Sequence, residues 1–189
     1  MIPETLENYI KEEWFKDHEA HYTPWPLQQM EIVVWKNPKR STYLINYIRA
    51  GNYLYVSGDV GDAIYCTGFD SLQRWSESDV GYFAGKCVAS ESGRLYREWD
   101  RNTIQKSVKE ALKNYSDKTW SDLEAFGGTS HMTCEEEWHM WLSMYANEFF
   151  GPDPCYWPTD GKIVSERCRG HLIGLKMVVK QLTEKGEIK

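Results

Sequence analysis

Hydrophobic and polar residues follow two different periods along the chain. Near the N-terminus, Leu6, Ile10 and Trp14 recur at every fourth position, which predicts an amphipathic helix over residues 4–18. The prolines of YTPWPL (22–27) cannot continue a helix, so we expect the helix to end before them. The chain is therefore predicted to begin with one short helix.

Four segments after this helix are rich in β-branched and aromatic residues, a composition typical of strands. Some of the connections between them are as short as AGN, and connections of this length favour antiparallel neighbours. We therefore predict an N-terminal antiparallel β-meander of about four strands, formed by MEIVVWK (30–36), TYLINYIR (42–49), NYLYVS (52–57) and DAIYCTG (62–68).

The rest of the chain repeats apolar residues at helical spacing. One predicted helix begins near residue 78 and ends at Gly93, and a second covers residues 102–118. A third begins with Thr133 and Glu136 at capping-box spacing and ends at Gly151. The apolar face of the first helix is Val80, Phe83, Ala84, Cys87 and Val88, and a fourth helix carries the seam Cys168, Leu172, Leu175, Val179 and Leu182.

Strands followed by helices are the order of an α+β domain. We predict a single domain over residues 1–189, in which residues 1–68 contain the first helix and the antiparallel sheet. Residues 69–189 form a mainly helical part, so that about five α-helices pack against the sheet.

Composition places the protein in a broad class. The chain of 189 residues is 41% hydrophobic, which is enough for a packed core. Its five cysteines are odd in number and form no C-x-x-C pair, which favours free thiols in a reducing compartment. No apolar run approaches the roughly 20 residues of a membrane span. We therefore expect a cytoplasmic protein that does not associate with membranes.

Charge is unevenly distributed within the formal net charge of −6. Residues 36–58 carry four bases and no acid, whereas residues 161–189 carry seven bases and three acids. Blocks of this kind can determine the choice of partner, although each is equally a solvated face. Residues 119–160 contain no Lys or Arg and eight acids, Asp122, Glu124, Glu135, Glu136, Glu137, Glu148, Asp153 and Asp160.

The segment GDVGD (58–62) has two interpretations. Asp59 and Asp62 are candidate ligands of a divalent cation, because hard cations prefer carboxylate oxygens. Glycine and aspartate are equally the residues of a tight turn between two strands. The turn is the favoured interpretation, and the pair remains an alternative loop site.

The segment HMTCEEEWH (131–139) is a second candidate. Glu135 and His139 stand four residues apart on the predicted helix, where both can reach one metal ion. No further ligand pair completes a tetrahedral set, and three acids in a first turn also stabilise the positive end of a helix. We predict no catalytic residue, no bound metal and no cofactor.

A basic and aromatic strand region raises the possibility of nucleic-acid binding. Arg40 and Arg49 are interleaved with Tyr43, Tyr47 and Tyr55, and strand aromatics can stack on bases. The motif of RNA-binding sheets is absent and the net charge is acidic. We therefore expect no direct DNA binding.

Two stretches, YLYVSGDVGDAIYCTG (53–68) and YFAGKCVASESGRLYREWD (82–100), resemble a family of small accessory proteins encoded by tailed bacteriophages of low-GC and gut bacteria. The resemblance covers residues 40–115 and implies no catalytic residues. Phage accessory proteins of this size often disarm host defence, and some are anti-CRISPR inhibitors. The resemblance thus implies a phage protein that acts in the cytoplasm of the host cell.

The resemblance and the charge pattern together give one hypothesis. The protein is expected to be an inhibitor, not an enzyme, that binds a host defence protein, a CRISPR nuclease with its guide RNA. An acidic face would block the positively charged channel for nucleic acid. The alternatives are a small metal-dependent enzyme and a protein that sequesters a nucleotide near residues 36–49. The residues predicted for the acidic face are Asp122, Glu124, Glu135, Glu136, Glu137 and Glu148.

Overall fold

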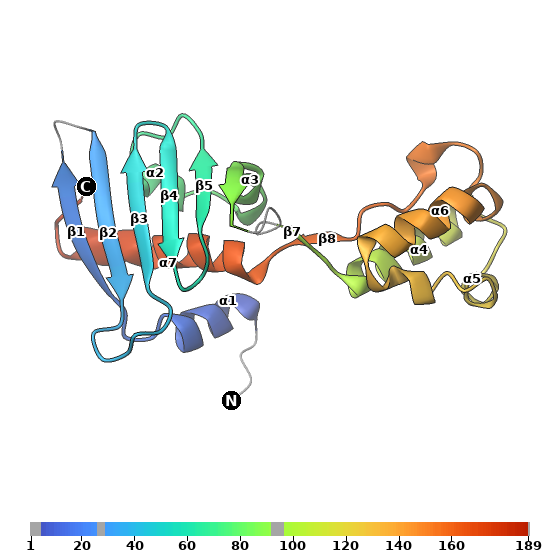
Figure 1. Cartoon of the computed structure of the whole chain (residues 1–189), viewed down its shortest axis with the longest axis horizontal. Helices are drawn as coiled ribbons and strands as arrows, with labels where there is room; N and C mark the ends of the chain where they lie inside the picture. Colours follow the sequence, from blue (N-terminus) through green and yellow to red (C-terminus); the bar gives the residue numbers. More distant parts are fainter. Residues whose placement is uncertain (1–4, 26–28, 92–96, 189) are drawn as a thin grey trace. The chain divides into compact units, whose positions relative to one another are not determined.

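The computed structural model describes residues 5–25, 29–91 and 97–188. It confirms the α+β class, with an antiparallel sheet in the N-terminal half and helices in both halves of the chain (Figure 1). The chain forms two compact units. We call residues 1–97 with 164–189 the sheet unit, and residues 98–163 the helical unit.

The sheet is an antiparallel meander in which consecutive strands are neighbours. The four predicted strands are all present, with one more at each edge of the sheet. The strand β1 was not predicted because its sequence contains Pro24, and an edge strand tolerates a proline that a central strand does not. The strands are β1 Glu19–Trp25, β2 Met30–Lys36, β3 Ile45–Ala50, β4 Tyr53–Gly58, β5 Ala63–Cys66 and β6 Cys87–Ser90.

The last strand, β6, replaces the second half of a predicted helix. The helix α3 covers only Val80–Gly85, and the helical prediction for the residues after it is wrong. Cys87 and Ala89 pair instead with β5, where backbone hydrogen bonds of the sheet outweigh the apolar spacing. The predicted helix end at Gly93 lies outside the described residues.

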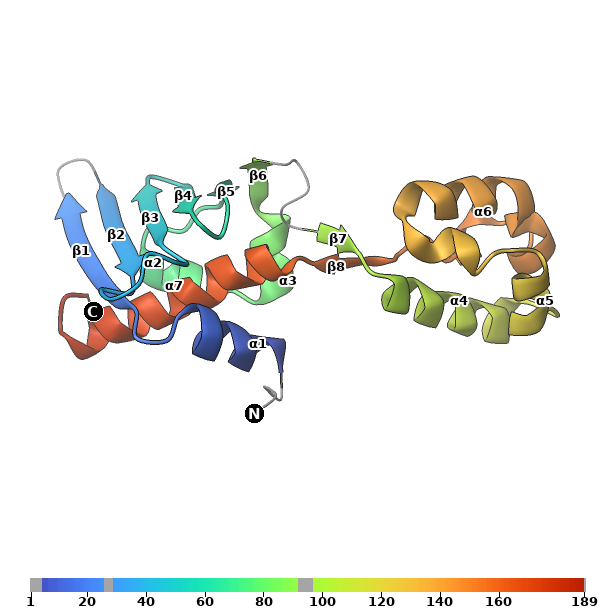
Figure 2. The same ribbon diagram turned by 60° about the horizontal axis from the view of Figure 1, so that its bottom comes forward.

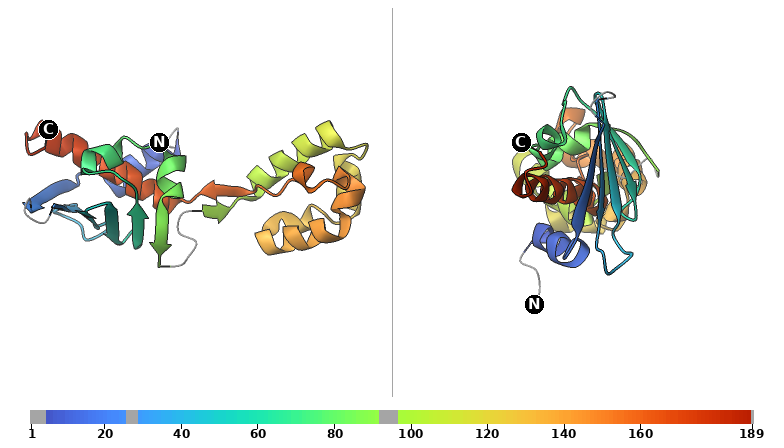
Figure 3. Two further views of the ribbon diagram at one scale, coloured as in Figure 1. Left: turned by 90° about the horizontal axis from the view of Figure 1, so that it is seen from above. Right: turned by 90° about the vertical axis from the view of Figure 1, so that its left-hand side faces the viewer.

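The helices of the sheet unit all lie on one side of the sheet (Figure 3). The predicted N-terminal helix is present as α1 Leu6–Tyr9, which continues into a π-helical turn over Ile10–Trp14. The other helices on this side are α2 Leu72–Ser76, α3 and α7 Glu166–Glu184.

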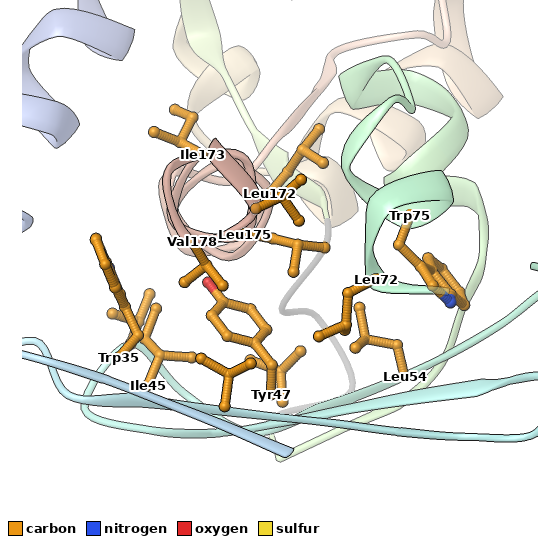
Figure 4. Close-up of a cluster of buried hydrophobic side chains, with 14 of the residues drawn as sticks. Trp35, Ile45, Tyr47, Leu54, Leu72, Trp75, Leu172, Ile173, Leu175 and Val178 are labelled. Carbon is orange, nitrogen blue, oxygen red and sulfur yellow. The ribbon is translucent and has the colours of Figure 1, made fainter. Parts of the chain in front are cut away.

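The core of the sheet unit lies between α7 and the sheet (Figure 4). The predicted seam of α7 is buried and packs on the sheet and on α2. Two glycines of α7 permit this close approach. A Cβ atom on Gly170 would lie 2.5 Å from the ring of Trp14, and one on Gly174 would lie 2.5 Å from the Tyr47 hydroxyl.

The helices of the helical unit lie beside one another (Figure 2) and enclose a core of their own. Its long helices, α4 Arg101–Tyr115 and α6 Glu135–Phe150, were both predicted. A short helix, α5 Trp120–Ala125, was not. The segments that enter and leave the unit, β7 Arg97–Trp99 and β8 Lys162–Val164, pair as a two-stranded sheet. The buried residues are Ile104, Val108, Ala111, Leu112, Leu123, Met132, Trp138, Trp141, Leu142, Ala146, Phe149 and Phe150.

The predicted capping box of α6 is wrong. The N-cap residue is Cys134, which makes no side-chain cap, and Thr133 instead donates a hydrogen bond to Glu137 over 2.5 Å. The capping box of this unit belongs to α5, where Thr119 and Asp122 satisfy each other's backbone N–H groups. The spacing of Thr133 and Glu136 is therefore displaced by one residue from the actual helix start.

The two units divide the chain differently from the predicted division after residue 68. The sheet unit takes α7 from the C-terminal end of the chain, because the apolar seam of this helix is needed to cover the sheet. Residues 98–163 form a core without it. Among the described residues, no helix has the length and apolar character needed to span a membrane.

Candidate functional site

The negative charge of the protein belongs to the helical unit. Residues 98–163 contain twelve acidic and six basic side chains, a formal charge of −6. The sheet unit contains sixteen of each and is formally neutral. A unit with this excess attracts basic surfaces and repels nucleic acid.

Charge is also segregated within the helical unit. The helix α4 carries Arg101, Lys106, Lys109 and Lys113 and a single acid. The helices α5 and α6 carry acids and no Lys or Arg. The ammonium group of Lys109 lies 4.7 Å from the ring centre of Trp120, so part of the positive charge of α4 packs against α5.

The six predicted acidic-face residues come from three places on these two helices. Asp122 and Glu124 lie on α5, and Glu135, Glu136 and Glu137 form the first turn of α6. Glu148 lies near the other end of α6 and shares an exposed stripe with Glu137, because eleven residues are about three helical turns.

The carboxylates differ in how far they are already neutralised. Lys162 lies 2.6 Å from Glu135, so this member of the face has a counter-ion. Glu124 accepts a hydrogen bond from the Trp120 indole over 2.8 Å. Hydrogen bonds from the Thr119 hydroxyl and backbone lower the pKa of Asp122, which keeps this exposed carboxylate ionised.

Apolar side chains interrupt the acidic stripe of α6. Met140 and Met144 lie between Glu137 and Glu148 and are 52% and 56% exposed. Exposed methionines adapt their shape to a binding partner. The stripe thus combines charge at its ends with a deformable apolar centre.

The segment GDVGD is a structural turn between β4 and β5. Its glycines Gly58 and Gly61 have φ angles of 133° and 104°, which favour glycine. The Asp59 carboxylate accepts a hydrogen bond from the Leu44 N–H over 3.0 Å, and the Asp62 carboxylate accepts one from the Gly58 N–H over 3.1 Å. Both aspartates are therefore occupied in holding the turn.

This turn is also bound to α7 through a buried histidine. His171 Nε2 lies 3.1 Å from the Gly61 carbonyl, which can only accept, so Nε2 carries the proton. His171 Nδ1 then accepts from the Tyr65 hydroxyl over 2.9 Å. Burial lowers the pKa of His171 to about 4, so the ring is neutral at pH 7.

The described residues contain no group of three or more His, Cys, Asp and Glu side chains that can hold a metal ion. Of the predicted pair on α6, Glu135 is paired with Lys162, and the His139 ring packs edge-on against Trp99. Neither the GDVGD turn nor this pair therefore gains a further ligand from the described fold.

Of the four bases in the basic strand region, Lys36, Lys39 and Arg40 are exposed and Arg49 is buried. Tyr47 is fully buried, and Arg49 is 7% exposed on the helix-covered face. The Arg49 guanidinium is paired with Glu31, its direct cross-strand neighbour. A cavity of about 540 Å³ adjoins this pair, and because Asp70 also lines it, it does not favour a phosphate group.

Sequence reasoning did not identify Glu31, although this residue joins three elements. Its carboxylate accepts hydrogen bonds from Arg49 on β3, from the Tyr22 hydroxyl on β1 and from the Leu72 N–H at the start of α2. Burial of the Tyr22 hydroxyl, together with the negative charge of the nearby Glu31, raises the pKa of Tyr22 to about 12. The sequence signal that could have identified Glu31 is its position as the only acid in the otherwise apolar strand MEIVVWK.

Comparison with known proteins adds no relationship: no protein-family model, no curated protein and no solved structure matches the chain.

Proposed function

We propose that the protein is a phage-encoded anti-defence protein that inhibits a host CRISPR nuclease by binding it, without catalysing a reaction. In this proposal the helical unit binds the guide-loaded nuclease in the host cytoplasm and occupies its positively charged channel. Target DNA is then excluded by charge and by volume.

The observation that carries the proposal is the confinement of the entire net charge of −6 to residues 98–163. A channel that holds nucleic acid is lined with Lys and Arg, and a compact acidic unit is complementary to it. The helices α5 and α6, which carry these carboxylates, contain no Lys or Arg. The exposed Met140 and Met144 add apolar contact area beside the charges.

The proposal is tested with a purified RNA-guided nuclease loaded with guide RNA. Cleavage of target DNA is measured with the full chain present at low and at high salt. We expect inhibition at low salt that weakens as salt is added, because contacts between exposed charges are screened. The variant Glu124→Gln/Glu137→Gln/Glu148→Gln should inhibit less, since it removes three charges from α5 and α6.

The matched control is Glu12→Gln/Glu13→Gln/Glu19→Gln, which removes the same number of charges from exposed positions of the sheet unit. We expect this variant to inhibit as the unaltered chain does. Equal inhibition by both triple variants, or inhibition that is the same at every salt concentration, would exclude the acidic unit as the binding surface.

A further inference from the structure

The sheet unit has a face that none of its described helices covers. In Figure 1 the strands β1–β5 lie in front of α7, and in Figure 3 the helices of this unit lie on one side of the sheet. Side chains alternate between the two faces of a strand. Because Ile45 and Tyr47 point into the core below α7, Asn46 and Ile48 point to the open side.

The strand register places fifteen open-side residues in three rows that cross the sheet, and a shorter fourth row, Glu19 with Lys36, lies at one end of β1 and β2. The central row joins all six strands, and the rows on either side join five and four of them. The central row is Thr23, Ile32, Ile48, Tyr55, Ile64 and Ala89; one flanking row is Trp25, Met30, Ala50, Tyr53 and Cys66; the other is His21, Val34, Asn46 and Ser57.

These three rows contain no Asp, Glu, Lys or Arg. Their aromatic members are well exposed: Trp25 is 47%, Tyr53 is 43% and Tyr55 is 39% accessible to solvent. An exposed apolar area of this continuity is typical of an interaction surface, because scattered apolar residues are normal but a connected patch is not. We call these fifteen positions the open sheet face.

The size of the open sheet face fits a weak interface. Strands lie about 4.8 Å apart and same-face residues about 6.8 Å apart, so fifteen positions cover roughly 500 Å². Two such faces in contact would bury about 1,000 Å², the lower limit for a specific interface. This area is enough for a reversible dimer and too small for an obligate one.

The central row of one copy can pack against the central row of a second copy that is related to it by two-fold symmetry. A two-fold axis parallel to the strands, between β3 and β4, would bring Ile48 opposite Tyr55 of the partner subunit. The same axis would pair Ile32 with Ile64 and Thr23 with Ala89, so each pair joins uncharged residues. The fifteen positions of two copies meeting in this way bring no like charges together, and packed sheets prefer this aligned arrangement.

We propose that the open sheet face is the contact of a homodimer in which two copies of this chain pack sheet against sheet. This inference concerns the sheet unit and does not rest on the proposed inhibition of a nuclease. The bulky side chains near the axis, Tyr53 and Tyr55 with ring centres 6.1 Å apart, are expected to contribute most of the contact.

Sedimentation equilibrium of the full chain over a wide concentration range tests the proposal. We expect the mass to rise from one copy to two as concentration increases. Tyr55→Glu places like charges beside the axis and should remain monomeric at every concentration. The matched control is Tyr9→Glu, the same change at a 38% exposed position of α1, which should dimerise as the unaltered chain does.

A complementation experiment tests the axis itself. Ile48→Lys alone should also be monomeric, but a mixture of Ile48→Lys and Tyr55→Glu chains should form mixed dimers, because the new charges attract across the contact. Circular dichroism verifies that each variant is folded, and hydroxyl-radical labelling of Tyr53 in the unaltered chain should fall at high concentration.

Three results would overturn the homodimer: an unaltered chain that stays monomeric with unchanged Tyr53 labelling, a Tyr55→Glu chain that still dimerises, or a mixture that stays monomeric. If the unaltered chain is monomeric and Tyr55→Glu loses inhibition of a nuclease, the open sheet face binds a foreign protein instead.

Discussion

The two units of this protein present surfaces of opposite character. The sheet unit is formally neutral and exposes the fifteen uncharged positions of the open sheet face, whereas the helical unit carries the whole net charge of −6. Added sodium chloride does not screen association through apolar area, whereas it weakens association through exposed charges. The two proposed contacts therefore differ in their expected salt dependence and are experimentally separable.

The units also differ in how they are stabilised. The sheet unit buries a polar network, with His171, Tyr65 and the GDVGD turn on one side and Glu31 with Arg49 on the other. In the core of the helical unit, the rings of Trp138 and Trp141 stack 5.1 Å apart. Changes of pH should thus act mainly on the first unit, and changes of core volume test the second.

The largest expected effect follows from truncating the helical core. Trp141 is fully buried and donates a hydrogen bond to the Phe126 carbonyl over 3.2 Å. Trp141→Ala should destabilise the helical unit by about 3–5 kcal/mol, because it leaves a large cavity. Calorimetry of the full chain should show one transition moved to a lower temperature, with the transition of the sheet unit retained.

A single transition that moves as a whole in Trp141→Ala would contradict the independence of the two cores. Leu175→Ala, the corresponding truncation in the core of the sheet unit, is the control and should move the other transition.

The next effect is a pH dependence confined to the sheet unit. The pKa of His171 is about 4 in the folded state against an ordinary value of 6.5, so the unfolded chain binds the proton more readily. Stability is therefore complete above pH 6.5 and is lost as pH falls toward 4, by about 3 kcal/mol in total. Urea unfolding at pH 7 and pH 4.5 measures the loss.

The comparison variant for this prediction is His171→Asn, which cannot take up the proton. It should be less stable at pH 7, because hydrogen bonds of Gly61 and Tyr65 are lost. It should lack the part of the pH dependence that lies between 4 and 6.5, and an unchanged slope in this variant would assign that slope to other groups.

The smallest effect concerns the start of α5. Thr119→Ala removes the capping box with Asp122 and should cost about 1 kcal/mol in the helical unit. The same substitution at Thr133, which does not cap α6, should cost less. Thermal unfolding of both variants gives the comparison, and equal losses would argue against the capping assignment.

The strands of the sheet that could be predicted from the sequence are those whose signals lie within the strand and its adjoining turns. The strands over residues 30–68 carry alternating buried positions and short turns, which are local signals. The edge strands β1 and β6 form because they pair with β2 and β5, and this pairing has no signal in the local sequence. In β1, Pro24 argued against a strand, and in β6 the residues Cys87 and Val88 continued an apolar spacing of helical type.

The surfaces were less predictable than the fold. The acidic composition of α5 and α6 was visible, but the partners of individual carboxylates, such as Lys162 with Glu135, come from residues distant in sequence. The burial of Arg49 and its pairing with Glu31 depend on strand register. The open sheet face likewise appears only when the register aligns Ile32, Ile48 and Tyr55.

The most direct test of the separation between the two surfaces is one salt series applied to both associations. Sodium chloride is varied while sedimentation measures self-association of the full chain and its binding to a guide-loaded nuclease. We predict that the nuclease complex weakens steeply with salt and that the dimer does not. A dimer that dissociates with salt, or a nuclease complex that is unaffected by it, would contradict this division between the units.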